Sequence, residues 1–130
     1  YYNLDNGTGK IRGLYLEHND SIKTIFEQWL QPLREMGVTK LSMGSEGASD
    51  QVSFDAVGIP AFEFIQDPID YETRTNHTNM DNYDHLLPDD LKQAAAVVAW
   101  FVYNSANMDQ KLPRKKMPKP QPWLFDSFKP

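Results

Sequence analysis

The chain has 130 residues, the size of one ordinary domain, and its 40% hydrophobic and 24% charged residues exclude general disorder. The lack of cysteine in the sequence excludes disulfides and thiolate metal sites, so His, Asp and Glu are the strong metal ligands that remain. The net charge of −5 is uneven: residues 111–130 hold six basic residues and one acidic residue, whereas residues 1–110 hold seven and 17, and this acidic body argues against nucleic acid as a partner.

The front of the chain predicts two neighbouring strands. Residues 1–5 and 10–16 are rich in apolar side chains, and the Asn-Gly-Thr-Gly sequence of residues 6–9 between them predicts a hairpin turn with positive φ at its glycines. Because the sequence begins inside the first of these strands and not at a methionine, we expect it to be the later part of a longer chain.

A helix is predicted after the second strand. Asp20 and Ser21 are expected to cap its N-terminus, and Gly37 is expected to end it. Its apolar residues recur at a spacing of three and four: Ile22, Ile25, Phe26, Trp29, Leu30 and Leu33. Residues 38–43 then predict a short strand, and the small residues of 44–50 predict a loop suited to the rim of a site.

The second half of the chain continues this alternation. Residues 52–57 predict a helical turn, residues 61–65 predict a strand, and residues 66–87 form a polar loop whose length indicates a functional role. Pro88 opens a last helix that runs to about residue 108, because proline and the acidic residues after it suit a helix start. The expected buried stripe of this helix is Leu91, Ala94, Ala95, Val98, Phe101 and Val102.

These elements divide the chain into a body and a tail. Alternating strands and helices predict an α/β layered fold for residues 1–110. Loops at the strand ends are expected to bring Asp5, Asp50 and His77 to one edge of the sheet. Residues 111–130 predict a proline-rich, basic tail whose aromatic residues pack on the body, and no apolar run approaches the length needed to cross a bilayer.

Residues 76–85 crowd two histidines and two carboxylates into one segment that is able to bind a metal. His77 is either a metal ligand or a solvated loop residue, and Asp81, four residues later, either orients its imidazole or caps a turn. Asp84 and His85 fit the capping of the helix that follows, and this interpretation is favoured for Asp84.

Asp5 and the pair Ser49-Asp50 are possible partners of this segment from elsewhere in the fold. Asp-Asn-Gly at residues 5–7 is also ordinary turn chemistry, and Ser49-Asp50 equally fits the cap of the next helical turn. These residues do not make a complete active site by themselves.

Three sequence blocks resemble the C-terminal half of the di-zinc exopeptidase family that includes bacterial leucyl aminopeptidase and plasma glutamate carboxypeptidase. The blocks are residues 4–5 (Leu-Asp), residues 49–54 (Ser-Asp-Gln-Val-Ser-Phe) with 58–61 (Gly-Ile-Pro-Ala), and residues 77–81 (His-Thr-Asn-Met-Asp). They keep the order of the family over about residues 1–90.

The resemblance implies a fold and a set of site residues. The fold is part of an α/β/α sandwich with a mixed β-sheet, of which the chain is the C-terminal half. Asp5 and His77 are each implied to be a ligand to one zinc of a two-zinc centre. Asp50 is implied to lie in the rim segment, with Asp81 near His77 but outside the ligand set. That rim segment usually reads Ser/Thr-Asp-His in the family, whereas this chain has Gln51.

The same resemblance implies a zinc-dependent exopeptidase, of aminopeptidase or carboxypeptidase type, in which a metal-activated water hydrolyses peptides or amino-acid conjugates. The other ligands of the family, a His, a bridging Asp and a Glu, come from the half that precedes these blocks, as does the general base. We therefore expect the isolated chain to be inactive and to need that half as its partner. Export of the whole protein is expected from the resemblance alone.

Two alternatives from other classes remain. A non-catalytic α/β binding module would use the loop of residues 66–87 for a partner. A serine hydrolase would draw on Ser49 or Ser53 with His77 and Asp81, but residues 47–51 lack the second glycine of a nucleophile elbow.

Overall fold

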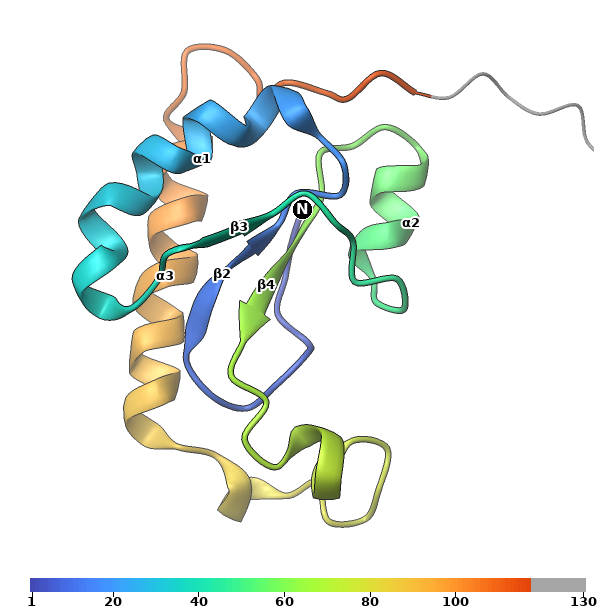
Figure 1. Cartoon of the computed structure of the whole chain (residues 1–130), viewed down its shortest axis with the longest axis vertical. Helices are drawn as coiled ribbons and strands as arrows, with labels where there is room; N and C mark the ends of the chain where they lie inside the picture. Colours follow the sequence, from blue (N-terminus) through green and yellow to red (C-terminus); the bar gives the residue numbers. More distant parts are fainter. Residues whose placement is uncertain (118–130) are drawn as a thin grey trace, which may run out of the picture.

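The computed structural model describes residues 1–117, which form a four-stranded sheet with helices packed around it (Figure 1). The strands are β1 (Tyr2–Asn3), β2 (Ile11–Tyr15), β3 (Lys40–Ser42) and β4 (Phe62–Gln66). Their order in the sheet is β1-β4-β2-β3. β2 runs parallel to β3 and antiparallel to β4, and β4 runs parallel to β1. The α/β fold with a mixed sheet is therefore confirmed.

Helices form at the predicted positions, with small shifts at their ends. They are α1 (Lys23–Leu30), α2 (Gln51–Ala56) and α3 (Pro88–Ala106), with shorter turns η1 (Asp20–Ile22), η2 (Gln31–Met36), η3 (Tyr71–Thr75) and η4 (Tyr83–His85). No helix within residues 1–117 has the length and apolar character that a membrane span requires.

The predicted helix after β2 consists of η1, α1 and η2 in succession. Gly37 ends it as expected, with a left-handed φ of 80° that glycine adopts without strain. The predicted cap is wrong, because Asn19 is the N-cap residue and it makes no side-chain capping bond. The predicted cap of the last helix by Asp84 is also wrong: Leu87 is the N-cap residue of α3 and makes no side-chain capping bond. Asp84 lies in η4, where its N–H donates a hydrogen bond to the side chain of the N-cap residue Asn82.

The predicted hairpin between residues 1–5 and 10–16 is wrong. β4 lies between β1 and β2, so these two strands do not pair. Gly7 and Gly9 are needed for a different reason from the one predicted, since neither has a positive φ. The loop instead runs against Asp67, whose carbonyl oxygen accepts a hydrogen bond from the Gly9 N–H, and a Cβ on either glycine would lie 2.7 Å from that oxygen.

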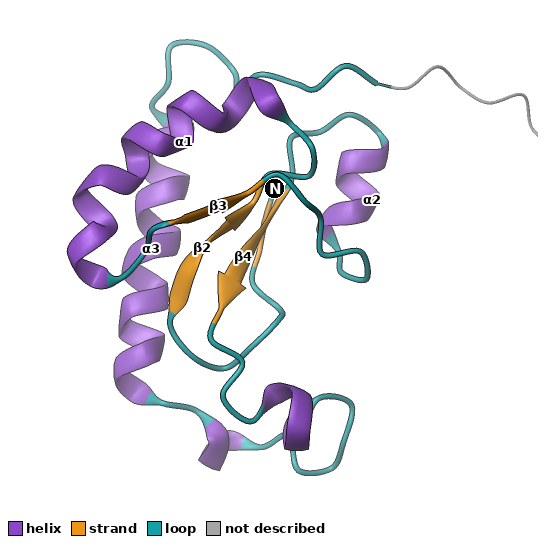
Figure 2. Cartoon of the chain, viewed as in Figure 1, coloured by secondary structure: helices purple, strands orange, loops and turns teal. Residues whose placement is uncertain are grey.

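The main core lies between the sheet and the pair of helices α1 and α3, while α2 lies on the other side of the sheet (Figure 2). Side chains alternate between the two faces of a strand, so Phe62 and Phe64 of β4 enter this core while Glu63 points to the opposite face. The same alternation in β1 directs Tyr2 to the core and Asn3 to the face of Glu63. One face of the sheet is therefore apolar and the other carries polar groups.

The buried stripe predicted for α3 is partly wrong. Ala94 and Phe101 are buried as expected, but Leu91 and Val102 are 45% and 47% exposed. Ala95 is exposed as well, whereas Gln93 and Val97 are buried in its place. The apolar surface of α3 is thus wider than the part that contacts the sheet.

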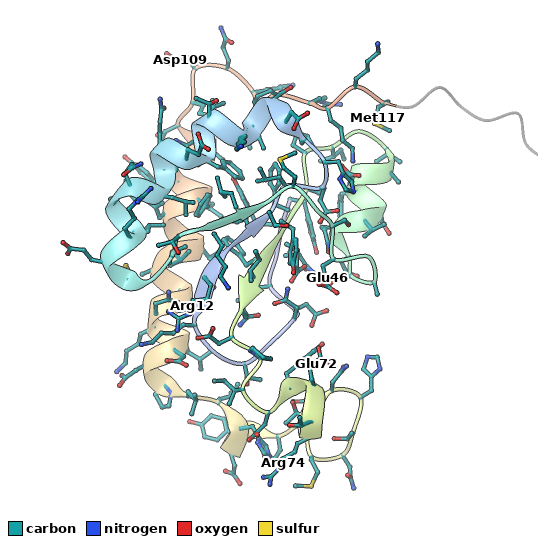
Figure 3. All side chains as sticks on the ribbon, in the orientation of Figure 1. Arg12, Glu46, Glu72, Arg74, Asp109 and Met117 are labelled. Atoms are coloured by element: carbon teal, nitrogen blue, oxygen red, sulfur yellow. The ribbon has the colours of Figure 1, made fainter. Side chains whose placement is uncertain are left out.

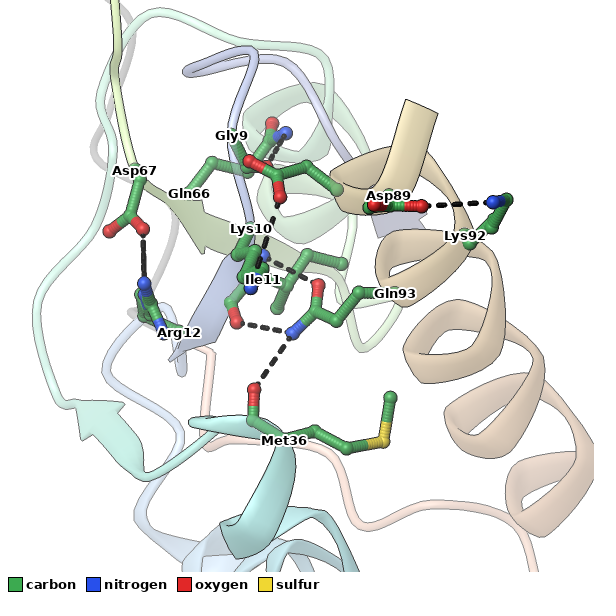
Figure 4. Close-up of polar contacts among 11 residues, drawn as sticks. Gly9, Lys10, Ile11, Arg12, Met36, Gln66, Asp67, Asp89, Lys92 and Gln93 are labelled. Carbon is green, nitrogen blue, oxygen red and sulfur yellow. Dashed lines mark hydrogen bonds and ion pairs between the residues drawn. The ribbon is translucent and has the colours of Figure 1, made fainter. Parts of the chain in front are cut away.

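The side-chain amide of Gln93 joins α3 to the start of β2. Its Oε1 accepts a hydrogen bond from the Ile11 N–H, and its Nε2 donates one to the Ile11 carbonyl, both at 2.9 Å (Figure 4). Gln93 is 8% exposed and Ile11 is fully buried, so water does not replace these bonds easily.

We expect Gln93→Leu to destabilise the fold. The N–H and C=O of Ile11 would be left without partners, at a cost of about 1–3 kcal/mol for each orphaned group. Chemical denaturation measures the free energy of unfolding. The matched control is Lys92→Leu, because Lys92 is exposed and its ion pair with Asp89 on the surface contributes little. Equal losses in the two variants would show that the Gln93 bonds are not important.

The described part of the tail lies on the body. The Nζ of Lys115 donates a hydrogen bond to the Glu17 carbonyl at 2.7 Å and forms an ion pair with Asp55 of α2. The Asn19 side chain donates to the Pro113 carbonyl at 3.0 Å, and Leu112 packs against the core. The predicted packing of the tail aromatics, Trp123, Phe125 and Phe128, lies outside the described residues.

Candidate functional site

A cleft of about 400 Å³ opens on the polar side of the sheet. Its walls come from the loop after β1, the loop of residues 44–50, the end of β4 and the segment from η3 to His77. Figure 3 shows Glu46 and Glu72 on two of these segments, and both residues line the cleft. Within residues 1–117, the lining includes the carboxylates of Asp5, Glu46 and Glu72 and no Lys or Arg. The cleft is therefore negatively charged and suited to a cation.

Asp5 lines this cleft, two residues after the end of β1. Its main chain is held from two sides: its N–H donates to Oε1 of Glu63 at 2.8 Å, and its carbonyl accepts a hydrogen bond from the Tyr71 hydroxyl at 3.2 Å. From the described residues, its carboxylate accepts one long hydrogen bond, donated by the Ser49 hydroxyl at 3.4 Å. The backbone of Asp5 is thus fixed while its carboxylate keeps free acceptor capacity.

His77 lines the same cleft from the segment that follows η3. It is exposed and has a φ of 57°, in the left-handed region that residues other than Gly adopt rarely. Among residues 1–117, no hydrogen bond involves its imidazole, so both ring nitrogens are free to bind a ligand. The structure therefore brings Asp5 and His77, which are far apart in the sequence, to one cavity.

Asp50 and Asp81 lie elsewhere. Asp50 is the N-cap residue of α2, is exposed, and makes no side-chain capping bond. Asp81 is exposed in the turn closed by its N–H and the Thr78 carbonyl, and neither residue lines the cleft. Within the described residues, Asp81 makes no hydrogen bond with His77.

A buried polar network behind the cleft was not predicted from the sequence. Glu63 is fully buried, and its Oε2 accepts a hydrogen bond from Nδ2 of Asn3 at 2.6 Å. The same amide of Asn3 also donates to the Ser49 hydroxyl at 2.6 Å. Gln51 is also fully buried, and its Oε1 accepts a hydrogen bond from Nδ2 of Asn3 at 3.4 Å. Its Nε2 donates one to the Glu46 carbonyl at 2.7 Å. The network therefore joins β1, β4, α2 and the loop of residues 44–50.

Burial governs the acid–base properties around this network. Burial raises the pKa of the Glu63 carboxyl, and the hydrogen bonds from Asn3 and from the Asp5 N–H offset only part of that effect. Burial, followed by the charges of Glu46 and Glu63, raises the pKa of Tyr15. Burial also raises the pKa of Tyr71, with the charge of Asp5 adding to it. The two tyrosines of the cleft are therefore neutral hydrogen-bond donors at neutral pH.

The donor atoms of the cleft fit a zinc site in kind but not in number. Carboxylate oxygen and imidazole nitrogen are both good zinc ligands, and Asp5 and His77 supply one of each. A zinc site takes three or four protein ligands, whereas no three His, Asp or Glu side chains within residues 1–117 are grouped to hold a metal. A complete site needs ligands from outside this part of the chain.

Comparison with known proteins assigns the chain to a family. The sequence profile of Peptidase family M28 matches residues 1–102. The chain belongs to this family. Carboxypeptidase Q of Mus musculus is 30% identical over 110 residues, which make up 85% of this chain but 23% of the mouse protein. No solved structure matches the chain.

Membership of peptidase family M28 confirms the resemblance found in the three sequence blocks. The serine hydrolase alternative is not supported by the arrangement of its candidate residues. The Ser49 hydroxyl contacts Asn3 and Asp5, and no hydrogen bond joins it to an imidazole within the described residues. Ser53 is exposed on α2 and does not line the cleft.

Proposed function

We propose that the chain is the C-terminal part of a zinc-dependent exopeptidase domain of the M28 family, acting on peptides or amino-acid conjugates. The observation that carries the proposal is the meeting of Asp5 and His77 at one acidic cleft. Each would supply one ligand to one of two zinc ions. Asp50 would support the rim of the site through its loop, and Asp81 would shape the turn that presents His77.

When bound, the two zinc ions would polarise the scissile carbonyl and lower the pKa of a bound water. The residues of this chain would hold and orient the metals and border the substrate cleft. The left-handed backbone at His77 supports this role, because strained conformations of this kind cluster at functional sites. The remaining ligands and the general base would come from the rest of the domain.

The rest of the domain is the partner that we propose for the exposed apolar surface of α3 and for the open edge of β1. β1 is an edge strand that pairs with β4 on one side. Leu91 and Val102 of α3 and Leu4 after β1 are each 40–47% exposed, although they are large and apolar. Because the chain corresponds to 23% of the mouse relative, the region beyond the match is long enough to cover these surfaces. Export of the complete protein remains part of this proposal.

A non-catalytic binding module that uses residues 66–87 is the second candidate. It is favoured by the lack of any three His, Asp or Glu side chains grouped to hold a metal within residues 1–117. Calorimetric zinc titration of the full-length protein separates the two functions: an exopeptidase should bind two zinc ions tightly, and a binding module should bind none. Peptide hydrolysis by the zinc-loaded protein completes the test.

We expect the isolated 130-residue chain to show no peptidase turnover and only weak zinc binding. A single ligand for each metal cannot replace the three or four that zinc normally takes in proteins. The measurement is hydrolysis of a panel of short peptides with the full-length protein as the positive control. Turnover by the purified chain, free of contaminating peptidases, would contradict the proposed division of the site.

A further inference from the structure

Glu63 is a buried carboxylate whose two oxygens are both used. It belongs to β4, the strand between β1 and β2, and its side chain is fully buried on the polar face of the sheet. Oε1 accepts a hydrogen bond from the Asp5 N–H at 2.8 Å, and Oε2 accepts one from Nδ2 of Asn3 at 2.6 Å. Glu63 forms no ion pair with any residue in the range 1–117, so neutral donors alone hold the carboxylate.

A contribution to the stability of the fold does not explain why a carboxylate occupies this buried position. Burying a carboxylate without a positive partner is costly, and an apolar residue of similar size is usually at least as stable at such a position. The residues on either side of Glu63 in β4, Phe62 and Phe64, are buried and apolar. The presence of a carboxylate here therefore points to a role in geometry.

The contacts of Glu63 converge on Asp5. One oxygen binds the main-chain N–H of Asp5 directly. The other binds Asn3, whose amide donates to the Ser49 hydroxyl at 2.6 Å, and that hydroxyl donates to the Asp5 carboxylate at 3.4 Å. Both the backbone and the side chain of Asp5 are thus connected to a single buried group.

We infer that Glu63 is a positioning residue, which fixes Asp5 in the orientation that the metal site requires. This inference rests on the proposed function, since it assigns a purpose to the fixed position of Asp5. β1 consists of two residues, so the strand alone gives Asp5 little support. Hydrogen-bonding partners outside the ligand set commonly contribute about 10–100-fold to metal affinity by orienting the ligands.

The test compares variants of the full-length protein by three measurements: zinc affinity by chelator competition, thermal stability, and hydrogen exchange of the Asp5 amide by mass spectrometry. Glu63→Ala is expected to weaken binding of one zinc about 10–100-fold and to deprotect the Asp5 amide. Glu63→Gln keeps the shape and an acceptor for the Asp5 N–H but disturbs the bond with Asn3, so its losses should be smaller. Gln93→Leu, a buried polar change on the opposite side of the sheet, is the control for stability.

Unchanged zinc affinity in Glu63→Ala would overturn the inference. So would a loss of zinc affinity no greater than that in Gln93→Leu, if the two variants are equally stable. Equal exposure of the Asp5 amide in Glu63→Ala and Glu63→Gln would also overturn it. Asp5→Ala tests the proposed function separately: if this variant keeps both zinc ions, Asp5 is not a ligand and the proposed function fails. Loss of one zinc in Asp5→Ala but not in Glu63→Ala would leave the proposed function intact and refute the role of Glu63 alone.

Discussion

Replacing His77 by alanine in the full-length protein is expected to abolish most of the peptidase activity and to remove one zinc ion. Loss of an imidazole that binds the metal directly should cost more activity than loss of a residue that only hydrogen-bonds to a ligand. The fall in kcat/KM should therefore exceed the roughly 10–100-fold that the latter causes. His77 is exposed and makes no hydrogen bond through its ring within the described residues, so the substitution should leave the fold intact. Steady-state kinetics, zinc content and the melting temperature together measure these effects.

Asp84→Ala is the matched control, because Asp84 is an exposed residue of the same segment that does not line the cleft. Its side chain caps neither neighbouring helix, since Asn82 is the N-cap residue of η4 and Leu87 that of α3. We therefore expect activity and zinc content close to those of the wild type. Equal losses in His77→Ala and Asp84→Ala would show that His77 has no special role, and the assignment would fail.

Phe101→Ala is expected to cause the largest loss of stability. Phe101 is fully buried in α3, and its ring lies 5.1 Å from that of Phe26 and 5.7 Å from that of Phe64, measured between centroids. Removing a buried phenylalanine typically costs about 3–5 kcal/mol, through lost burial and the cavity that remains. Rings of Tyr2 and Trp29 also contact it, so the cavity would lie where the sheet meets both α1 and α3.

Tyr103→Ala is the control for this prediction. It lies on the same helix, is 65% exposed, and has a similar size and helix propensity. Chemical denaturation should show a change near zero for Tyr103→Ala and a large change for Phe101→Ala. Similar values would indicate that the aromatic cluster does not hold α3 on the sheet.

Local signals in the sequence predicted the helices and strands well. Gly37 ends its helix and Pro88 begins another at the expected positions, because backbone conformation at these residues depends on their immediate neighbours. The hairpin failed because pairing is not local: β4 comes later in the chain and inserts between β1 and β2. A turn sequence alone cannot show that a third strand will separate two others.

The same distinction applies to the candidate site. Asp5 and His77 were found through short motifs, and the structure places both at one cleft. Glu63 was missed because it was counted only as part of a strand. A charged residue inside the run Ala-Phe-Glu-Phe-Ile was the available signal, since an isolated carboxylate is rarely buried without a purpose. The roles of Asn3 and Gln51 could not be read from the sequence, because each depends on a partner brought close by folding.

The contacts of Lys115 have a practical meaning for protein engineering. This one ammonium group joins the turn after β2, where Glu17 and His18 adopt positive φ, to the helix that carries Gln51. A version of the protein shortened before Leu112 would release that turn and that helix at once, and both border the buried network behind Asp5. Truncation, fusion or tagging at the C-terminal end is therefore best made beyond Lys115.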